Sequence, residues 1–201
     1  MVIGITILFQ LTLPRSLTLF PEWVAPVVEL ALLVAVFLSN PRRIENSNRL
    51  TRILGLVLAA VLSTANAMSA VLLISGILDG KDQFNATELL GTGSAIWLTN
   101  VVVFSLWYWE LDRGGPSVRA EGTHEHPDFL FPQMMARVDA PHNWEPNFFD
   151  YFYTAFTNAT AFSPTDTMPL TRWAKMTMMA QSAISLCLVA IVVARAVNVL
   201  G

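Results

Sequence analysis

Residues 149–175 read FDYFYTAFTNATAFSPTDTMPLTRWAK. An aromatic run from Phe148 to Ala161 gives way to a polar Thr, Ser, Pro and Asp stretch, and a long apolar segment follows. The run has 14 residues, which is too short for a helix that crosses a bilayer core of about 30 Å. Irregular backbone behind it is stable at membrane depth only where it packs against protein or lines water. The pattern therefore predicts a helix at 148–161 that dips into a membrane and a loop at 161–170 that turns back.

The composition supports a membrane environment. Of the 201 residues, 54% are hydrophobic and 13% are charged, and the mean hydropathy is +0.51. A soluble domain usually carries about 25% charged residues. We therefore expect the lipid bilayer to be the main partner of the chain. A net charge of -3 gives no basis for a nucleic-acid partner, and the single cysteine, Cys187, excludes an intrachain disulfide.

Further apolar segments flank this region. Helices are predicted at 2–13 (short), 20–39 and 53–78 within an N-terminal membrane part, residues 1–90. The C-terminal part, residues 91–201, has predicted helices at 91–109 and 173–200, and a polar loop at 110–147 lies between the first of these and the short helix. Residues 79–88 are predicted to be a loop. The predicted fold is an all-α integral membrane protein of four to five helices, with a re-entrant helix and loop before the last one.

Two of these helices carry further membrane signals. The helix at 53–78 has small polar residues on one face, namely Ser63, Asn66, Ser69 and Ser75. Such residues favour close packing and hydrogen bonds between helices in lipid. The helix at 91–109 ends in Trp107, Tyr108 and Trp109, an arrangement typical of the membrane–water interface.

Several short motifs near the re-entrant segment occur in a recognisable order. They are Phe156, Thr157 and Thr160 at the end of the short helix, Asp166 after the loop, Pro169, Leu170, Thr171 and Ala174 before the last helix, and AIVVAR at 190–195. In this order they resemble the pore module of tetrameric potassium channels, in which a pore helix ends in Thr-Thr-Val-Gly-Tyr-Gly-Asp and an inner helix follows. The resemblance covers about residues 147–200, with 91–109 as the outer helix. It implies a homotetramer that conducts inorganic cations passively, without an enzymatic activity.

The whole chain also resembles an actinobacterial membrane-protein group that carries the same FTNATAFSPTD sequence, found here at 156–166. This second resemblance implies a multi-pass protein of the bacterial plasma membrane, the inner membrane.

The chain departs from the channel family in the filter itself. Ala161-Phe162-Ser163-Pro164-Thr165 stands where the family has Thr-Val-Gly-Tyr-Gly. Both glycines are missing, and a side chain is strained at the positive φ angles that glycine adopts. Pro164 also fixes its own φ near -65° and biases Ser163 toward extended backbone. A potassium filter of the usual geometry is therefore not expected.

We expect a wider ion pathway instead, formed by Thr160, Ala161, Phe162, Ser163, Pro164, Thr165 and Asp166. In a fourfold assembly Asp166 would supply a ring of negative charge, which attracts cations. Phe162 could form a hydrophobic constriction. The alternative for Asp166 is a carboxylate that anchors the loop by bonding backbone amides. No cofactor is expected, beyond a monovalent cation in the pore.

The positive charges suggest an orientation. Alternate sides of the predicted spans collect nine Lys and Arg residues against three. Positive-inside reasoning would place the larger set, and therefore the entrance of the pore loop, in the cytoplasm. A potassium channel has the reverse arrangement.

Two other readings stay open. The first is a membrane scaffold or sensor with the channel fold, in which Phe162 and Pro164 plug the pore. The second is a small intramembrane enzyme that uses Glu29, Asp166 or loop histidines, because buried carboxylates in membranes are often functional. His124, Glu125, His126 and Asp128, with His142 further on, offer metal-type ligands, although the Gly/Pro-rich loop provides no fixed scaffold for zinc.

Overall fold

The computed structural model describes residues 49–80, 84–120, 126–135, 144–160 and 166–200. The helices predicted at 2–13 and 20–39 lie outside these ranges. In chain order the described elements are α3 (Arg49–Leu78), α4 (Ala86–Leu111), η2 (Asp112–Gly114), α5 (Pro116–Ala120), β1 (Phe129–Leu130), η3 (Pro132–Met134), α6 (Phe148–Thr160), β2 (Met168–Pro169) and α7 (Arg172–Leu200). Long helices dominate, in agreement with the predicted all-α class.

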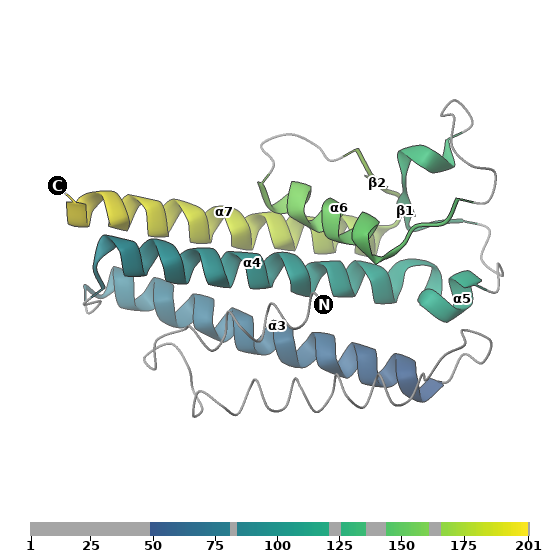
Figure 1. Ribbon diagram of the computed structural model, residues 1–201, viewed down its shortest axis with the longest axis horizontal. Coiled ribbons are helices and arrows are strands. Elements are labelled where there is room, and N and C mark those ends of the chain that lie inside the picture. The colour runs from purple at the N-terminus through teal and green to yellow at the C-terminus, as the bar shows by residue number, and fades with distance from the viewer. Residues whose placement is uncertain (1–48, 81–83, 121–125, 136–143, 161–165, 201) are drawn as a thin grey trace.

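Three helices form a bundle with α4 at its centre (Figure 1). α3, α4 and α7 lie side by side, and α4 also packs against the shorter α6. Among the described residues, α3, α4 and α7 are the helices that are long and apolar enough to cross a membrane. In the most apolar part of each, 61% of α4 is buried inside the protein but only 22% of α7, so most of the circumference of α7 remains uncovered within one chain.

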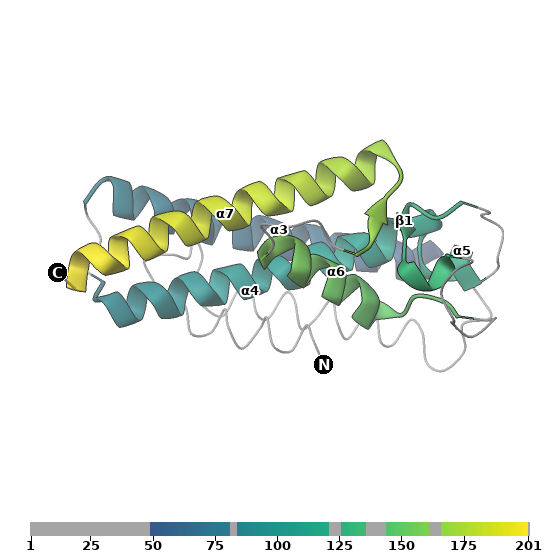
Figure 2. The same ribbon diagram turned by 90° about the horizontal axis from the view of Figure 1, so that it is seen from above.

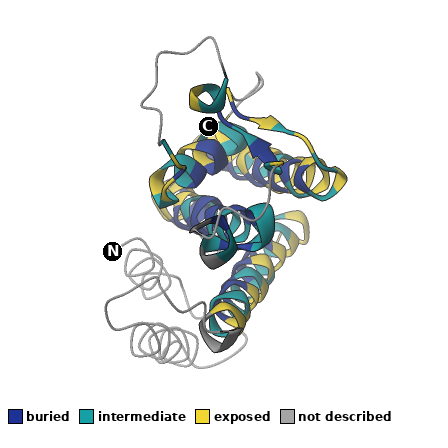
Figure 3. Cartoon of the chain, turned by 90° about the vertical axis from the view of Figure 1, so that its right-hand side faces the viewer, coloured by how far each residue is buried: buried dark blue, intermediate teal, exposed yellow. Residues whose placement is uncertain are grey.

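The two ends of the bundle differ. At one end α3 begins, α4 ends and α7 begins, and the short elements α5, β1, η3 and β2 gather there; we call it the cap end (Figure 1). At the opposite end, the far end, α4 begins and α7 finishes. Figure 3 views the molecule from the cap end, with buried residues concentrated between the helices.

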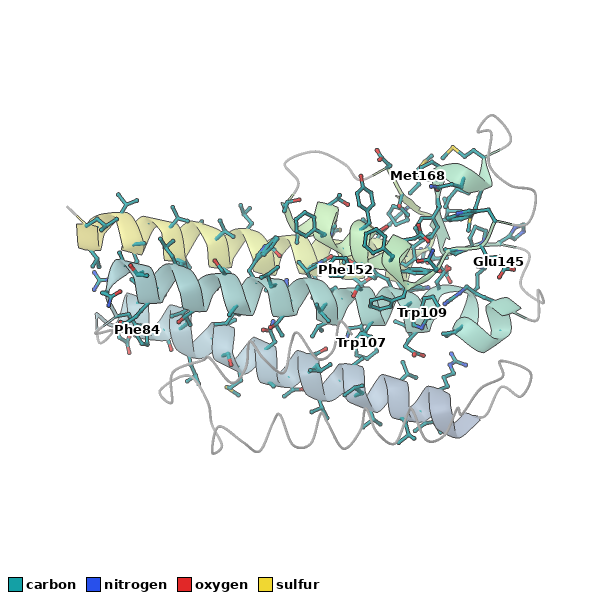
Figure 4. All side chains as sticks on the ribbon, viewed as in Figure 1. Phe84, Trp107, Trp109, Glu145, Phe152 and Met168 are labelled. Carbon is teal, nitrogen blue, oxygen red and sulfur yellow. The ribbon has the colours of Figure 1, made fainter. Side chains whose placement is uncertain are left out.

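Polar side chains help to join α3 to α4. The indole Nε1 of Trp107 donates a 2.8 Å hydrogen bond to the hydroxyl of Ser63, and Figure 4 shows Trp107 directed from α4 toward α3. Asn66 and Ser69 on the same face are also buried. The predicted hydrogen bonding between helices from this polar face is therefore confirmed at Ser63.

The start of α4 corrects the sequence prediction. Residues 85–88 were expected to continue a loop, but α4 begins at Ala86 with Asn85 as its N-cap. The Asn85 side chain accepts from the amide of Glu88 at 2.9 Å, and the Glu88 carboxylate accepts from the amide of Asn85 at 3.0 Å. This reciprocal pair is a capping box, which satisfies two amides that a helix start leaves free.

The end of α4 turns sharply into the cap. Arg113, Gly114 and Gly115 all have positive φ, at 50°, 80° and 104°. A Cβ at Gly115 would lie 3.0 Å from the carbonyl oxygen of Glu110, so this position favours glycine. The region predicted as a polar loop at 110–147 therefore contains a kinked helix end, α5, β1 and η3 in its described parts.

α6 is the short helix of the structure. Its 13 residues make a helix of about 20 Å at 1.5 Å per residue. It begins at the cap end, packs against both α4 and α7, and extends only part of the way toward the far end (Figures 1 and 2). β2 then lies at the cap end again, because Phe129 pairs with Pro169 and Leu130 with Met168 in an antiparallel ladder.

Candidate functional site

The candidate site is the region where α6 packs between α4 and α7. The chain enters this region and leaves it from the same end of the bundle. Thr167, which follows the loop, is buried beside α6, and its hydroxyl oxygen lies 3.0 Å from that of Thr154. Three residues further on, the amide of Leu170 donates to the carbonyl of Asp128 at 2.8 Å. The described segments on either side of residues 161–165 are thus both fixed to the cap half of the bundle.

Gln181 of α7 joins three helices. Its Oε1 accepts from the hydroxyl of Tyr108 on α4 at 2.7 Å and from the Nδ2 of Asn158 on α6 at 2.8 Å. Its Nε2 donates to the carbonyl of Ala155, also on α6, at 2.9 Å. The residue is fully buried, and both lone pairs of its oxygen are used. A satisfied buried network of this kind fixes the relative positions of α4, α6 and α7.

Asn158 extends this network along α6. Besides its bond to Gln181, its Nδ2 donates to the carbonyl of Met178 at 2.9 Å. The hydroxyl of Ser182 lies 3.1 Å from the Asn158 Oδ1. One turn further along α7, the hydroxyl of Ser185 accepts from the Nδ2 of Asn100 at 3.0 Å. Polar contacts between helices therefore continue past the end of α6 toward the middle of the bundle.

A second network surrounds the carboxylate of Asp112, which is completely buried at the end of α4. One oxygen accepts from the hydroxyl of Tyr151 at 2.6 Å, and from the Nε of Arg113 at 3.4 Å. The other accepts from the amides of Asp128 at 2.9 Å and Phe129 at 3.3 Å. Four donors around one carboxylate compensate the cost of burying its charge.

Asp128 continues this network to the last helix. Its carboxylate accepts from the amide of Arg113 at 2.8 Å and from the indole Nε1 of Trp173 at 2.9 Å. Asp128 was considered above as a metal ligand, but in the structure these protein donors already engage both of its oxygens. Asp112 and Asp128 together connect α4, β1, α6 and α7.

Arg119 closes the cap over this network. Its guanidinium carbon lies 4.5 Å from the ring centre of Trp109 and 5.2 Å from that of Tyr151, which are cation–π distances. Its Nη1 donates to the carbonyls of Trp109 and Asp112 at 2.7 and 2.8 Å, so it satisfies carbonyls at the end of α4. Burial lowers the pKa of Arg119, while the nearby Tyr151 and Asp112 oppose that change.

Burial also raises the pKa of the Tyr151 hydroxyl, and the charge of Asp112 raises it further. The hydroxyl therefore keeps its proton at neutral pH and can serve only as the donor toward that carboxylate. Aromatic rings pack around the pair: Phe129, Phe131 and Trp109 all contact Tyr151 edge to face, at centroid distances of 6.3, 5.3 and 5.6 Å.

The residues predicted to form the ion pathway are only partly described. Thr160 is the last residue of α6 and is exposed, and its hydroxyl bonds to carbonyls of its own helix. Asp166 is exposed at the bend before β2. Ala161, Phe162, Ser163, Pro164 and Thr165 lie outside the described residues.

The candidate carboxylates and metal ligands outside the ion pathway are also only partly described. Glu29, His124, Glu125 and His142 lie outside the described ranges, and within those ranges no group of three His, Cys, Asp or Glu side chains could hold a metal ion. Phe156 is exposed on α6, with its ring 5.6 Å from that of Trp97.

Sequence reasoning missed Asp112 and Tyr151 altogether. An aspartate immediately after an apolar helix was the one available signal, and it is also compatible with an ordinary helix end.

Comparison of the chain with models of protein families, with curated proteins and with solved structures found no match. The geometry of the site therefore carries the functional argument alone.

Proposed function

We propose that the chain is a subunit of a pore-loop, channel-like membrane protein that conducts cations passively, with a selectivity unlike that of potassium channels. The observation that supports this most directly is the length and position of α6. A helix of about 20 Å, locked between two helices of membrane-spanning length, has its flanking segments fixed at the same end of the bundle. In a membrane, a short helix followed by a return to the same side is the arrangement that brings a loop to membrane depth.

The electrostatics of α6 favour a cation at its end. A helix C-terminus carries about -0.5 elementary charge, and α6 ends at Thr160. Its last polar groups therefore face the start of the proposed ion pathway. Asp166, exposed at the other side of the loop, would add a ring of carboxylates in a fourfold assembly.

The proposed pore requires several copies of the chain, and α7 offers a face for them. The side of α7 opposite its buried face carries small exposed residues at helical spacing: Ala180, Ala183, Cys187, Ala190 and Ala194. Small residues allow close helix approach in membranes. We therefore propose a homotetramer in which the α7 helices of neighbouring copies approach each other.

Planar-bilayer recording of the purified, reconstituted protein tests this function. We expect discrete cation-carrying current steps whose amplitude falls in Asp166→Asn. The matched control is Glu145→Gln, because Glu145 is an exposed carboxylate at the same end of the bundle (Figure 4), outside the proposed pathway. Steps that are unchanged in Asp166→Asn would remove this residue from the pathway. A silent bilayer from a confirmed tetramer would instead favour the non-conducting scaffold or sensor.

One observation favours that second reading. The chain lacks both filter glycines. The hydrogen bonds of α6 to Gln181 and Asp112 do not separate the two readings. A rigid scaffold would need these contacts as much as a pore would. Because the two readings share the fold, only a measurement of current separates them.

A further inference from the structure

A groove lies beyond the C-terminal end of α6, where α6 no longer covers α4 and α7. We describe this position as beneath α6. The hollow nearer the cap end has a volume of about 300 Å³. It is lined by Trp97, Asn158, Ala159, Thr160, Ser182, Ser185, Leu186 and Val189. A second hollow of about 210 Å³ continues toward the far end and shares Trp97 and Val189 with the first. The two hollows therefore adjoin at these two residues along α4 and α7, and we call them together the groove.

The groove is uncharged along its length. The second hollow is lined by Leu90, Gly93, Ser94, Leu188, Val192 and Val193 besides the shared residues, and no lining residue of either hollow is Asp, Glu, Lys, Arg or His. Most of the side chains on its walls are apolar. The hydroxyl of Ser185 accepts from Asn100, and that of Ser182 donates to Asn158. The walls therefore complement an uncharged apolar chain better than a polar ligand.

The length and position of the groove match one leaflet of a bilayer. From Ser182 to Val193 it follows 12 residues of α7, and the 11 rises between them at 1.5 Å each span about 16 Å. Half of a bilayer core of about 30 Å is about 15 Å. The groove begins in the middle of the bundle, where α6 ends, and runs toward the far end of the helices.

The rim of the groove is continuous with the outer surface of the spanning helices. Leu90, Leu186, Val189 and Val193 line it and are all exposed, between 42% and 55%. An acyl chain in the groove would therefore stay connected to the surrounding lipid. It would reach Thr160, the last residue of the short helix.

We propose that this groove binds one acyl chain of a membrane phospholipid, which packs beneath the end of α6. The acyl chain fills the space that the 13-residue helix leaves along α4 and α7. It packs against the C-terminal end of α6 and so stabilises that helix. The proposal depends on the insertion of α4 and α7 in a bilayer and not on ion conduction. A second copy of the protein covering the same groove is the competing outcome.

The test uses the full chain, reconstituted in phosphatidylcholine with bromine atoms near the ends of its acyl chains. Bromine quenches indole fluorescence on contact, so the quenching lost in Trp97→Phe reports contact at the groove. Val189→Phe fills the junction of the two hollows. Val197→Phe is its matched control, because Val197 is an exposed valine on the same helix and lines neither hollow.

We expect Val189→Phe to reduce the Trp97-dependent quenching at least twofold and to reduce the phospholipid retained in native mass spectrometry, with Val197→Phe unchanged in both. Faster hydrogen exchange of the backbone amides at 155–160 in Val189→Phe would show that the bound acyl chain stabilises α6. Equal quenching and equal lipid retention in the two variants would overturn the proposal. A change of oligomeric state in Val189→Phe with no loss of lipid would assign the groove to a second copy. These outcomes do not depend on whether the protein conducts ions.

Discussion

The hydroxyl of Tyr151 on α6 lies 2.6 Å from the carboxylate of Asp112 at the end of α4, and both side chains are completely buried. The two residues are 39 positions apart in the chain. Asp112 also accepts a hydrogen bond from the amide of Phe129 in β1, and β1 pairs with β2 beyond the loop. The contact therefore connects the start of the short helix to the segment to which the chain returns.

Tyr151→Phe should destabilise the protein by about 1.5–3 kcal/mol, the usual contribution of a hydrogen bond to a charged group. The substitution keeps the ring and its packing but leaves a buried carboxylate with one donor fewer. Thermal unfolding in detergent micelles measures the effect. Tyr153→Phe is the control, since Tyr153 lies on the same helix with 47% of its surface exposed. Equal unfolding temperatures for the two variants would contradict a stabilising role for this contact.

Gln181→Leu should be destabilising although it places an apolar side chain in a buried position. Leucine keeps the approximate size of glutamine but leaves the buried Tyr108 hydroxyl without its acceptor. Each buried group left unsatisfied costs about 1–3 kcal/mol. Double variants can separate this cost from packing: Tyr108→Phe combined with Gln181→Leu should cost less than the sum of the two single changes. Strict additivity in the same unfolding assay would show that the two side chains are not coupled.

The helices could be read from the sequence because long apolar runs bounded by charged or turn-forming residues suffice to locate them. The prediction of 173–200 compares with α7 at Arg172–Leu200, and 148–161 compares with α6 at Phe148–Thr160. The start of α4 was missed although Asn85 and Glu88 form a readable Asn-x-x-Glu signal. The prediction followed the apolar pattern, which begins later than the helix itself.

The networks around the site could not be read in the same way. Asp112 gains its partners from Asp128, Phe129 and Tyr151 only once α4, β1 and α6 are packed together. Gln181 stands in the sequence as one polar residue inside an apolar helix, and no local pattern points to its partners on α4 and α6. A local pattern predicts where a helix lies, whereas the direction of a polar side chain depends on residues far away in the sequence. The geometry of Ala161–Thr165 remains a prediction from sequence alone.

Gly93 allows α4 and α7 to approach closely. A Cβ at this position would lie 2.7 Å from the Cγ1 of Val192, which is closer than packed atoms allow. Gly93→Ala should therefore cost about 1–3 kcal/mol through overpacking, and Val192→Ala should relieve part of that cost. Gly91→Ala is the matched control, because a Cβ there meets nothing within 4 Å. If Gly93→Ala unfolds at the temperature of Gly91→Ala, the close contact is not present in the folded protein.

The charges at the ends of the described spans predict an orientation. Arg52, Arg113, Arg172 and Lys175 lie at or near the cap end, whereas Arg195 lies toward the far end. Positive-inside reasoning then places the cap end in the cytoplasm. In a Cys187→Ala background, an impermeant thiol reagent added to intact cells should label Asp79→Cys and miss Glu145→Cys. The reverse pattern of labelling would restore the orientation of a potassium channel.

The last prediction concerns the approach of neighbouring α7 helices, and the single cysteine makes it directly measurable. Cys187 is exposed and lies among the small residues of the uncovered face of α7. A disulfide requires Cα atoms within about 7 Å, so oxidation should link two copies through Cys187 only if their α7 helices meet at this face. One cysteine per chain can give no covalent species larger than a dimer, and in a fourfold assembly that dimer should form efficiently.

The control moves the thiol by one residue, as Leu186→Cys in a Cys187→Ala background. Leu186 is also exposed, at 55%, but it points about 100° away around the helix and lines the groove beneath α6. It should form little covalent dimer under the same oxidation. Equal yields from the two positions would indicate random collision between copies, and a dimer from Leu186→Cys alone would place the contact on the groove side. Either result would contradict an assembly in which the small residues of α7 face each other.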